Sequence, residues 1–551
     1  MGTAAAARGA GGGLTAAGPA PASAGPALAA TEPALAATGP ALAAAEPALA
    51  AAEPVLAAGE IQGNVLPGFA TSCQALLFIE LPAGGDAGRR WLRSLPITTL
   101  ADLLTDVLTD GRPVAGPAWV NIALSYQGLA KVTPDADRLT DMPFKQGLAR
   151  RSVLLGDPRS PDSAGNCRNW VLGRPGRPGL DAVVIVAADR PDAVAAGVAA
   201  VRRGLPAGVE LAAVQHGQVR RAPHAGHEPF GFRDDISQPG VRGLLPGTGD
   251  PLTPRQNPAD PDQGRPGQNL VWPGEFVFGY PGQDPFDRRR PGPVALAGPS
   301  WARNGSYLVL RRLTQDVDGF RRFVRRAAAD LARRHPGLAG LTPELLAGKL
   351  MGRWRSGAPV TLAPHADRPG LGEDPLANND FAFAAPGEPT ACAATSADGG
   401  NGDDPGDPLG LRCPRAAHIR RAYPRGAATP GLTEASIETH RLLRRSIAFR
   451  DARRERGILF LAYQTSIERQ FEFVTRAWLN NPHLHDTGDG HDPVAGQSFG
   501  VDGDRTRVFT IPVRGPGGRV DRVSLTIPTD WVVPTGGGYF FAPSVSMIRG
   551  L

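Results

Sequence analysis

Three short segments of the chain carry the side chains that could do chemistry together. They supply the carboxylate of Asp234, the imidazole of His418 and the guanidinium of Arg444. A carboxylate can accept a proton from a reacting group and return it. An imidazole can bind a metal ion through one nitrogen while its other nitrogen donates a hydrogen bond. A guanidinium stays protonated and stabilises negative charge that develops in a reaction, so the set could support bond cleavage at a bound metal.

Each residue alone also has a more ordinary interpretation. His418 lies beside Ala416, Ala417 and Ile419, and a lone histidine in such a setting is more often part of the core than a ligand. Asp234 lies in the string GFRDDISQPG, where a single aspartate usually forms a turn. The residue types alone leave both interpretations open.

The strings around these residues decide in favour of chemistry. Residues 413–425, CPRAAHIRRAYPR, resemble the proximal-histidine segment of the dye-decolourising peroxidase family. The string GFRD resembles that family's G-x-x-D-G motif, and LLRRSIAF resembles its R-R-G-x-x-Y motif. Further agreement follows the family's order over nearly all of residues 60–551, in the strings NWVLG, PGEFVFGY, NGSYLVLRRLTQDV, NNDF, LAYQTSIERQFEF, HDPVAGQ and TGGGYFFAPS.

The resemblance implies that the cofactor is haem b. It makes His418 the axial ligand of the haem iron and Asp234 the catalytic residue that moves the peroxide proton. It also makes Arg444 the catalytic arginine over the haem, with the neighbouring Arg445 as the alternative.

Two further residues are assigned to the cofactor site by the same resemblance. Asp530, ahead of the closing strand, is expected to accept a hydrogen bond from the second nitrogen of His418. Arg425, at the end of the histidine segment, is expected to bind the cofactor. The sequence departs from the family at Asp235, where the motif has glycine, and at Ser446 and Phe449. Aspartate tolerates the left-handed backbone region better than most residues, so the loop around Asp234 should keep its shape.

The function implied by the resemblance is a haem peroxidase. It would reduce hydrogen peroxide and oxidise bulky aromatic donors such as dyes or phenols. Two alternatives from other classes remain at this stage: a haem-binding carrier or sensor with weak peroxidase activity, and an enzyme that removes iron from haem.

Strand and helix patterns alternate along the chain and predict an α+β fold. Apolar runs predict strands, and longer stretches between them predict helices, one of them opened by Pro191 at a position that a first helical turn accepts. The expected strands are 74–81, 119–126, 181–189, 276–280, 306–313 and 457–464, and the expected helices are 191–203, 316–334 and 466–479. The resemblance implies two ferredoxin-like halves in a dimeric α+β barrel-like arrangement, which we place at 60–235 and 236–551. The second half would hold the haem, and residues 386–411, rich in Gly, Asp and Pro, would form an inserted surface loop.

Residues 1–59 have a different composition, dominated by Ala, Gly and Pro. A seven-residue repeat, [G/E]-P-A-L-A-A-x, begins at Gly25 and recurs to Glu53, with a proline in each copy. Proline interrupts the helical turns that Ala and Leu favour, which predicts a disordered tether. The alternative is that the regularly spaced leucines dock a protein partner.

Composition excludes several other classes. The net charge of +6 comes from 59 basic and 53 acidic residues without a basic stripe, so nucleic acid is not an expected partner. The four cysteines, Cys73, Cys167, Cys392 and Cys413, form no metal-binding pattern and no disulfide framework. No run of 18 apolar residues predicts a membrane span. Without a recognisable signal peptide we expect a cytoplasmic protein, with secretion as the open alternative, and a homo-oligomer is compatible with the sequence.

Overall fold

The computed structural model describes most of the chain. Its described residues are 52–104, 117–177, 180–384, 406–426, 429, 432–484, 488–499 and 504–551. The predicted tail up to residue 51 and residues 386–405 of the predicted insertion lie outside this set.

The first half of the fold has the strand and helix order of a ferredoxin-like unit. Its elements are β1 (Cys73–Glu80), α1 (Asp86–Ser94), β2 (Trp119–Leu124), β3 (Ala182–Ala188), α6 (Pro191–Arg203) and β4 (Glu210–Gln218). The strands lie in the antiparallel order β2-β3-β1-β4. The expected strands 74–81, 119–126 and 181–189 and the expected helix 191–203 are therefore confirmed within a few residues, and α6 begins at its proline.

The second half repeats this order. Its elements are β9 (Ser306–Gln315), α7 (Val317–Arg334), β10 (Leu443–Arg444), β11 (Ile447–Arg450), β12 (Arg456–Gln464), the helical segments η7 (Glu468–Glu472) and η8 (Val474–Leu479), and β15 (Val532–Ala542). The strand order is β10-β12-β9-β15, with β11 also pairing with β12. The helix at 468–479 has π-type hydrogen bonds between residues five apart, from Glu472 N to Ile467 O and from Asn480 N to Thr475 O. The α+β class with two ferredoxin-like halves is confirmed.

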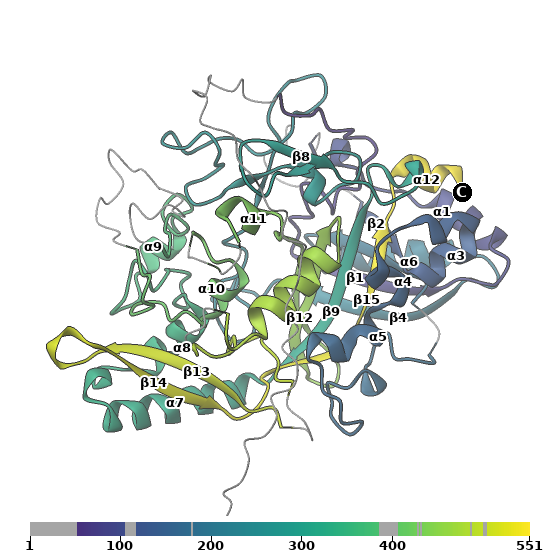
Figure 1. Cartoon of the computed structure of the whole chain (residues 1–551). Helices are drawn as coiled ribbons and strands as arrows, with labels where there is room; N and C mark the ends of the chain where they lie inside the picture. The colour runs from purple at the N-terminus through teal and green to yellow at the C-terminus, as the bar shows by residue number, and fades with distance from the viewer. Residues whose placement is uncertain are drawn as a thin grey trace, which may run out of the picture. The chain divides into compact units, whose positions relative to one another are not determined.

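The four strands of the first half and the five of the second join into one curved, nine-stranded sheet (Figure 1). Strand β15 pairs with β2 through Phe541 and Leu124. At the other ends of the two sheets β11 lies beside β4, where a Cβ on Gly217 would be only 2.4 Å from Cγ2 of Ile447. The sheet thus closes on itself in the barrel-like manner that the sequence predicts.

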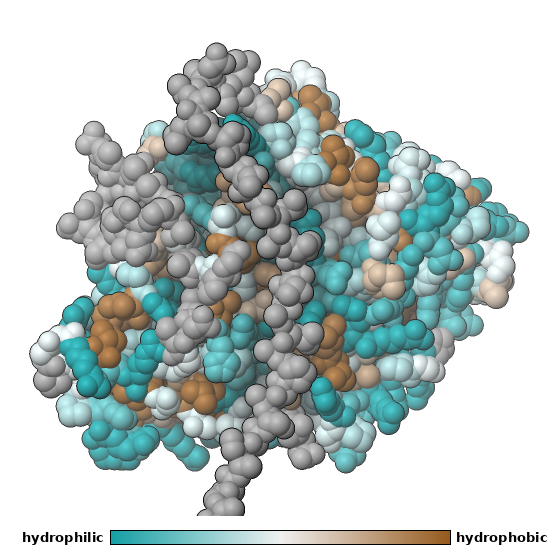
Figure 2. Space-filling view, viewed as in Figure 1, coloured by the Kyte–Doolittle hydropathy of each residue, from teal (hydrophilic) through white to brown (hydrophobic). Residues whose placement is uncertain are grey.

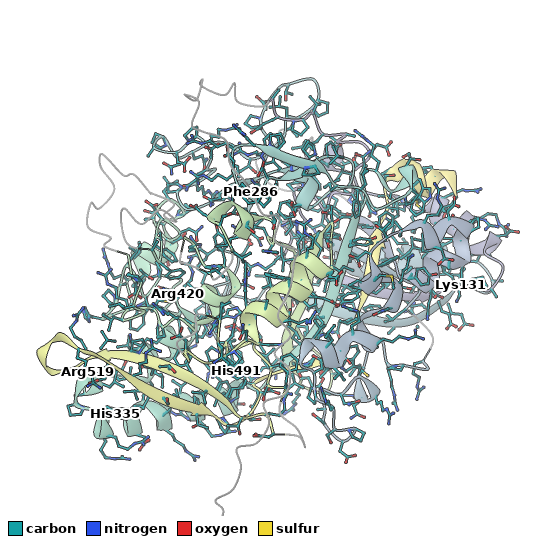
Figure 3. The ribbon with its side chains drawn as sticks, viewed as in Figure 1. Lys131, Phe286, His335, Arg420, His491 and Arg519 are labelled. Atoms are coloured by element: carbon teal, nitrogen blue, oxygen red, sulfur yellow. The ribbon has the colours of Figure 1, made fainter. Side chains whose placement is uncertain are left out.

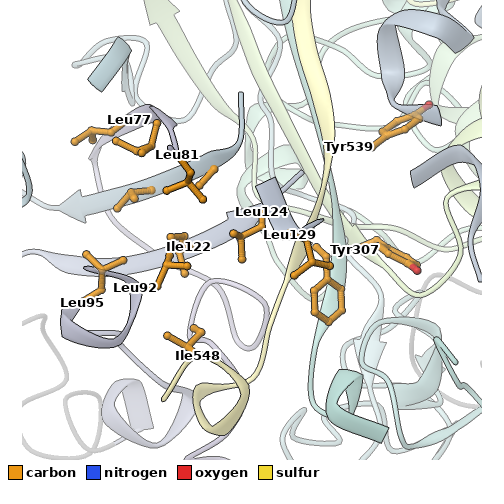
Figure 4. Packing of buried hydrophobic residues seen from close by; sticks show 14 of the residues in the cluster. Leu77, Leu81, Leu92, Leu95, Ile122, Leu124, Leu129, Tyr307, Tyr539 and Ile548 are labelled. Carbon is orange, nitrogen blue, oxygen red and sulfur yellow. The ribbon is translucent and has the colours of Figure 1, made fainter. Parts of the chain in front are cut away.

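Alternate residues of the strands fill two separate cores, as the two-residue period of a strand requires. Leu77 and Ile79 of β1 pack under the helices of the first half, whereas Leu76 and Phe78 point to the opposite face. Figure 4 shows the first of these cores, where β1, β2 and α1 meet the C-terminal helix α12 (Val545–Gly550) through Ile548. Both faces are covered at the centre of the sheet, so β1 and β3 are buried along almost their whole length.

Two local predictions differ from the structure. Residues 276–280, expected as a strand, form turns in which Val277 N donates to Pro273 O and Gly279 has φ 89°. Their apolar side chains are buried in a core, which explains why the segment reads as a strand. The hairpin of β13 (Arg507–Arg514) and β14 (Val520–Ile527), which packs on α7, has no counterpart among the predicted strands.

The last copy of the seven-residue repeat is part of the folded domain, which corrects the predicted tail boundary at residue 59. Leu56 is 0 % exposed, and its backbone N donates to Leu244 O at 3.0 Å. Glu53 forms ion pairs with Arg242 and Arg255. A buried leucine and a paired carboxylate hold this copy in place, so the folded domain begins inside the repeat.

The described end of the predicted insertion is also packed. Asp407 is buried and accepts hydrogen bonds from Arg412 N and Cys413 N, so residues 406–411 are anchored to the domain, with Leu409 exposed at the surface. Within the described residues no helix is both long and apolar enough to cross a membrane. The face seen in Figure 2 is mainly hydrophilic with scattered apolar patches.

Candidate active site

The imidazole of His418 is held by a buried carboxylate. His418 is the first residue of the short helix α10 (His418–Ala422), and its Nδ1 lies 2.7 Å from Oδ2 of Asp492. Asp492 is 0 % exposed, and its Oδ1 accepts hydrogen bonds from the backbone amides of Val494 and Ala495. Figure 3 labels Arg420, which lies on α10, and His491, which precedes Asp492 in the chain.

The contact fixes the charge and the tautomer of the pair. Burial raises the pKa of Asp492, but the charge and the hydrogen bond of His418 and the two amides outweigh it, and the net pKa is lowered. An ionised Asp492 keeps the proton on Nδ1 of His418, which leaves Nε2 as the nitrogen with a free lone pair. The His418 side chain is 27 % exposed, so it is not fully enclosed in the core.

Asp530 does not perform the role that the sequence suggested. Its Oδ2 accepts from Arg505 Nε at 2.5 Å, and its Oδ1 lies 3.3 Å from Nη2 of Arg507. These ion pairs hold the start of β13 to the segment before β15, so the prediction that Asp530 supports His418 is wrong. The string HDPVAGQ contained the signal for Asp492, but spacing along the chain does not show which aspartate folds back onto α10.

Asp234 lies on a loop that folds back on itself before the second half. Its backbone N donates to Gly226 O, and its Oδ1 accepts from the amide of Asp235 at 2.8 Å. Asp235 has φ 60° and is exposed, so the left-handed conformation expected at this position is confirmed. The aspartate therefore replaces the motif glycine without disturbing the loop.

Arg444 and Arg445 point to different parts of the structure. Arg444 Nη2 donates to Ser237 O at 2.7 Å, three residues beyond Asp234. Arg445 donates instead to the carbonyls of Asn64 and Val65, near the start of the domain. Arg444 is thus the arginine of the pair that faces the Asp234 loop.

The structure brings the three predicted groups within electrostatic reach of one another. Burial has the largest effect on the pKa of His418 and lowers it, but Asp492 raises it by more in total with its charge and hydrogen bond, so the net shift is upward. Two smaller effects come from the other predicted groups: the charge of Arg444 lowers the pKa of His418, and the charge of Asp234 raises it. Asp234, at the end of the first half, thus lies near His418 and Arg444 of the second half, although it is more than 180 positions from either in the sequence.

A second group of buried arginines lies against the same loop. Arg425 donates to Ser237 Oγ at 3.0 Å and to Asn379 O at 3.0 Å, and Arg353 donates to Asn379 Oδ1 at 3.0 Å. Arg353 is a residue that the sequence analysis missed. The string NNDF, which includes Asn379, was its only signal.

These two arginines carry charge that has no carboxylate partner. Among the described residues neither Arg353 nor Arg425 forms an ion pair. Arg353 is 5 % exposed and Arg425 is 6 % exposed. Burial, followed by the repulsion of Arg425, lowers the pKa of Arg353 to about 9, and burial lowers that of Arg425 to about 10. Both stay protonated at neutral pH, so the region has a surplus of buried positive charge that an anionic ligand would neutralise.

The donor set fits a haem. No group of three or more His, Cys, Asp or Glu side chains within the described ranges could hold a metal ion, so His418 would be a single protein ligand, as an axial haem ligand is. Two buried guanidinium groups would match the two propionates of the porphyrin. We find no feature of the described region that conflicts with this cofactor.

Two family models match the chain. The DyP dimeric alpha+beta barrel domain matches residues 60–221, and the C-terminal domain of Dyp-type peroxidases matches residues 399–499. The second match includes His418, Asp492 and Arg444.

Named proteins and solved structures resemble the chain over most of its length. Peroxidase 2 of Mycetinis scorodonius is 31 % identical over 510 residues, which are 89 % of this chain and 86 % of the relative. The dye-decolorizing peroxidase AauDyP1 of Auricularia auricula-judae is 29 % identical over 509 residues, with the same shares. The structure of an ancestral D-type dye-decolorizing peroxidase superposes with a TM-score of 0.70 at 31 % identity and covers 90 % of this chain and 99 % of that one. A dye-decolorizing peroxidase solved with 2,6-dimethoxyphenol has a TM-score of 0.66 at 27 % identity, with 90 % and 99 % covered.

Proposed function

The chain belongs to the dye-decolourising peroxidase family and is a peroxidase, and from this premise we propose that it binds haem b on His418 and uses Asp234 and Arg444 to cleave hydrogen peroxide. The relatives are peroxidases, so we set aside the alternatives of a haem carrier and of an enzyme that removes iron. The observation that carries the proposal is the hydrogen bond of 2.7 Å between His418 Nδ1 and the buried carboxylate of Asp492.

The His418–Asp492 pair prepares one nitrogen for iron. Asp492 accepts the Nδ1 proton, so Nε2 presents its lone pair and the imidazole gains basicity. The bound haem would supply the two electrons that reduce the peroxide. The backbone amides of Val494 and Ala495 hold the Asp492 carboxylate in position beside His418.

Asp234 and Arg444 would act on the proton and the negative charge of the bound peroxide. The carboxylate of Asp234 takes the proton from one peroxide oxygen and delivers it to the departing oxygen, which leaves as water. The guanidinium of Arg444 stabilises the negative charge on that departing oxygen and keeps its own proton. Its hydrogen bond to Ser237 O fixes it against the loop that carries Asp234.

Arg353 and Arg425 would bind the propionates of the haem. Both guanidinium groups are buried and share Asn379 Oδ1, and the pKa shifts above leave both charged. An Arg–carboxylate bond is charge-assisted and more directional than a bond from lysine. The negative charges of the two propionates would thus neutralise the two buried guanidinium groups.

The donors oxidised by the enzyme would be aromatic molecules such as phenols and dyes. This proposal is supported by a related structure that holds 2,6-dimethoxyphenol and by relatives that are named dye-decolorizing peroxidases.

Replacing His418 with alanine tests the proposal. The purified His418→Ala variant should have lost the Soret band of the parent and most of its haem, because the protein bond to iron is gone. It should also fail to oxidise 2,6-dimethoxyphenol with hydrogen peroxide. His365→Ala, at an exposed histidine, is the matched control and should keep the parent's haem content. An unchanged spectrum and haem content in His418→Ala would refute the assignment.

A further inference from the structure

A cavity separate from the proposed haem site lies beside the segment that precedes Asp234 in the chain. Its volume is about 430 Å³, within the range of about 300–1,000 Å³ that is typical of small-molecule sites. The walls come from the loop at 220–231, from α7, from the first two residues of α8 (Pro343–Met351), and from Arg355 and Ser356, which follow that helix. None of His418, Asp234, Arg353, Arg425 and Arg444 lines it.

The charge of this cavity is strongly positive. Four guanidinium groups line it against one carboxylate, that of Glu344. Among the residues that the structure describes, none of these four arginines forms an ion pair, whereas many other arginines of the domain do. The four are Arg220, Arg321, Arg325 and Arg355. The cavity therefore has a net positive charge, although the carboxylates of Glu344 and of the buried Glu228 act on Arg355.

One of the four arginines is a built part of the cavity wall rather than a mobile surface group. Arg355 is half-buried, its Nη1 donates to Phe230 O, and its guanidinium lies 5.1 Å from the ring centroid of Phe232. Gly231 makes room for it, because a Cβ there would lie 2.7 Å from Arg355 Nη1. Burial, followed by the charge of Arg321, lowers the pKa of Arg355, so an anion placed between them would relieve that repulsion.

Apolar side chains also line the cavity. Phe320 and Val324 lie on α7, the helix that carries Arg321 and Arg325, and are 1 % and 4 % exposed, and Pro343 of α8 adds a third apolar surface. The ring of Phe320 packs on that of Phe230, with centroids 4.7 Å apart. A cavity lined by arginines and by apolar side chains selects a ligand that is anionic at one end and apolar at the other.

We propose that this cavity binds an organic oxyanion, a carboxylate or sulfonate carried on a flat apolar body. The oxyanion lies among Arg321, Arg325 and Arg355, and the apolar body lies against Phe320 and Val324. The inference rests on the cavity alone and is independent of the function proposed for the haem site.

Binding there also holds the loop that carries Asp234. Arg355 is tied to this loop at two points, because its O accepts from Arg233 N at 3.1 Å and its Nη1 donates to Phe230 O. A ligand that immobilises Arg355 therefore reduces local opening of residues 224–234, which is observable as slower amide hydrogen exchange.

Calorimetric titration of the holoenzyme tests the proposal with three probes. 2-Naphthalenesulfonate carries both features of the ligand, sodium sulfate carries only the charge, and 2-naphthalenemethanol carries only the apolar body. We expect one 2-naphthalenesulfonate per chain and an affinity at least about tenfold higher than for either partial probe, since charge and apolar contacts add. Equal affinity for sulfate or for the alcohol would overturn the proposal, as would the absence of sulfonate binding.

Two double variants on α7 locate the bound sulfonate. Arg321→Gln with Arg325→Gln removes two exposed charges of the cavity and should raise the Kd about tenfold. Arg322→Gln with Arg326→Gln removes the same charge from exposed positions of the same helix that do not line the cavity, and should leave the Kd within about twofold because salt screens distant charges. The parent, but not the first variant, should show slower exchange at 224–234 when the sulfonate is present at a fixed concentration near the parent's Kd.

The same comparison excludes other locations. An equal loss of affinity in both variants would assign the effect to general surface charge and overturn the proposal. A Kd unchanged in the first variant together with a perturbed Soret band would place the sulfonate in the haem site and would also overturn it.

Discussion

Replacing Asp492 with asparagine should weaken haem binding far more than the same change at Asp530. Both oxygens of Asp492 accept hydrogen bonds, Oδ2 from His418 Nδ1 and Oδ1 from the amides of Val494 and Ala495. Asparagine has only one acceptor oxygen, so one of the two sides must lose its partner. When the oxygen stays with the amides, the NH₂ group faces Nδ1 and favours the tautomer with the proton on Nε2, which cannot bind iron.

The magnitude follows from the bond that is lost. A hydrogen bond to a charged group contributes about 1.5–3 kcal/mol, and about 1.4 kcal/mol corresponds to a factor of ten. Haem affinity should therefore fall about tenfold to a hundredfold, which agrees with the effect of losing a partner that orients a metal ligand. Asp530→Asn alters a carboxylate whose side chain is 8 % exposed and which pairs with arginines instead of His418, and it should leave haem affinity unchanged.

Haem transfer to excess apomyoglobin measures this effect. The absorbance change at the Soret band gives the rate of haem loss from the parent and from each variant. We expect faster loss from Asp492→Asn only. A parent-like rate in Asp492→Asn, or a faster loss from Asp530→Asn, would show that Asp492 does not position the iron ligand.

Three further predictions concern the distal arginine, a buried acid and the start of the domain. Arg444→Leu should slow the reaction with peroxide about a hundredfold in stopped-flow mixing. Arg445→Leu should mainly lower the thermal unfolding temperature, because the guanidinium of Arg445 donates to two backbone carbonyls. The reverse pattern would identify Arg445 as the arginine that acts on the peroxide. Burial raises the pKa of Glu275 from 4.5 to about 7, so its folded form binds a proton more tightly and stability falls as pH rises through this window. Urea unfolding at about pH 8 should therefore show Glu275→Gln more stable than the parent by about 3 kcal/mol, with no gain at about pH 4, and a pH-independent difference would contradict the shift. Deleting residues 1–51 should leave the unfolding temperature unchanged, whereas deleting 1–59 also removes a fully buried leucine and should cost about 2–3 kcal/mol or more; equal unfolding temperatures would show that the last repeat adds nothing.

Much of the fold could be predicted because it rests on local patterns. The strands at 74–81 and 306–313 are apolar runs of strand length, and Pro191 marks the start of α6. The segment at 276–280 has the same composition as a strand, but glycines on either side let it turn, and only its tertiary setting buries it. Composition cannot separate a buried turn from a buried strand.

The candidate site could be predicted in its residue types but not in its pairings. His418 and Asp234 are visible from the strings around them. The choice of Asp492 over Asp530 depends on how the loop after η8 folds back onto α10, which no spacing encodes. Arg353 was missed because an arginine after a helix is ordinarily a surface residue, and its burial follows from carbonyl groups supplied by residues 357 and 378.

The contacts that the last repeat copy makes with the domain determine how the N-terminal region can change in length. Glu53 and Leu56 of the last repeat copy are held by contacts with the domain. The earlier copies differ from this copy at few positions, and the copy at 46–52 has the same Glu, Pro, Leu and Ala pattern. Deletion of one seven-residue unit would bring Glu46 and Leu49 to the positions of Glu53 and Leu56, whereas deletion of two units would bring Gly39, which has no carboxylate for Arg242 and Arg255. The ion pairs of this copy therefore depend on how many units are removed.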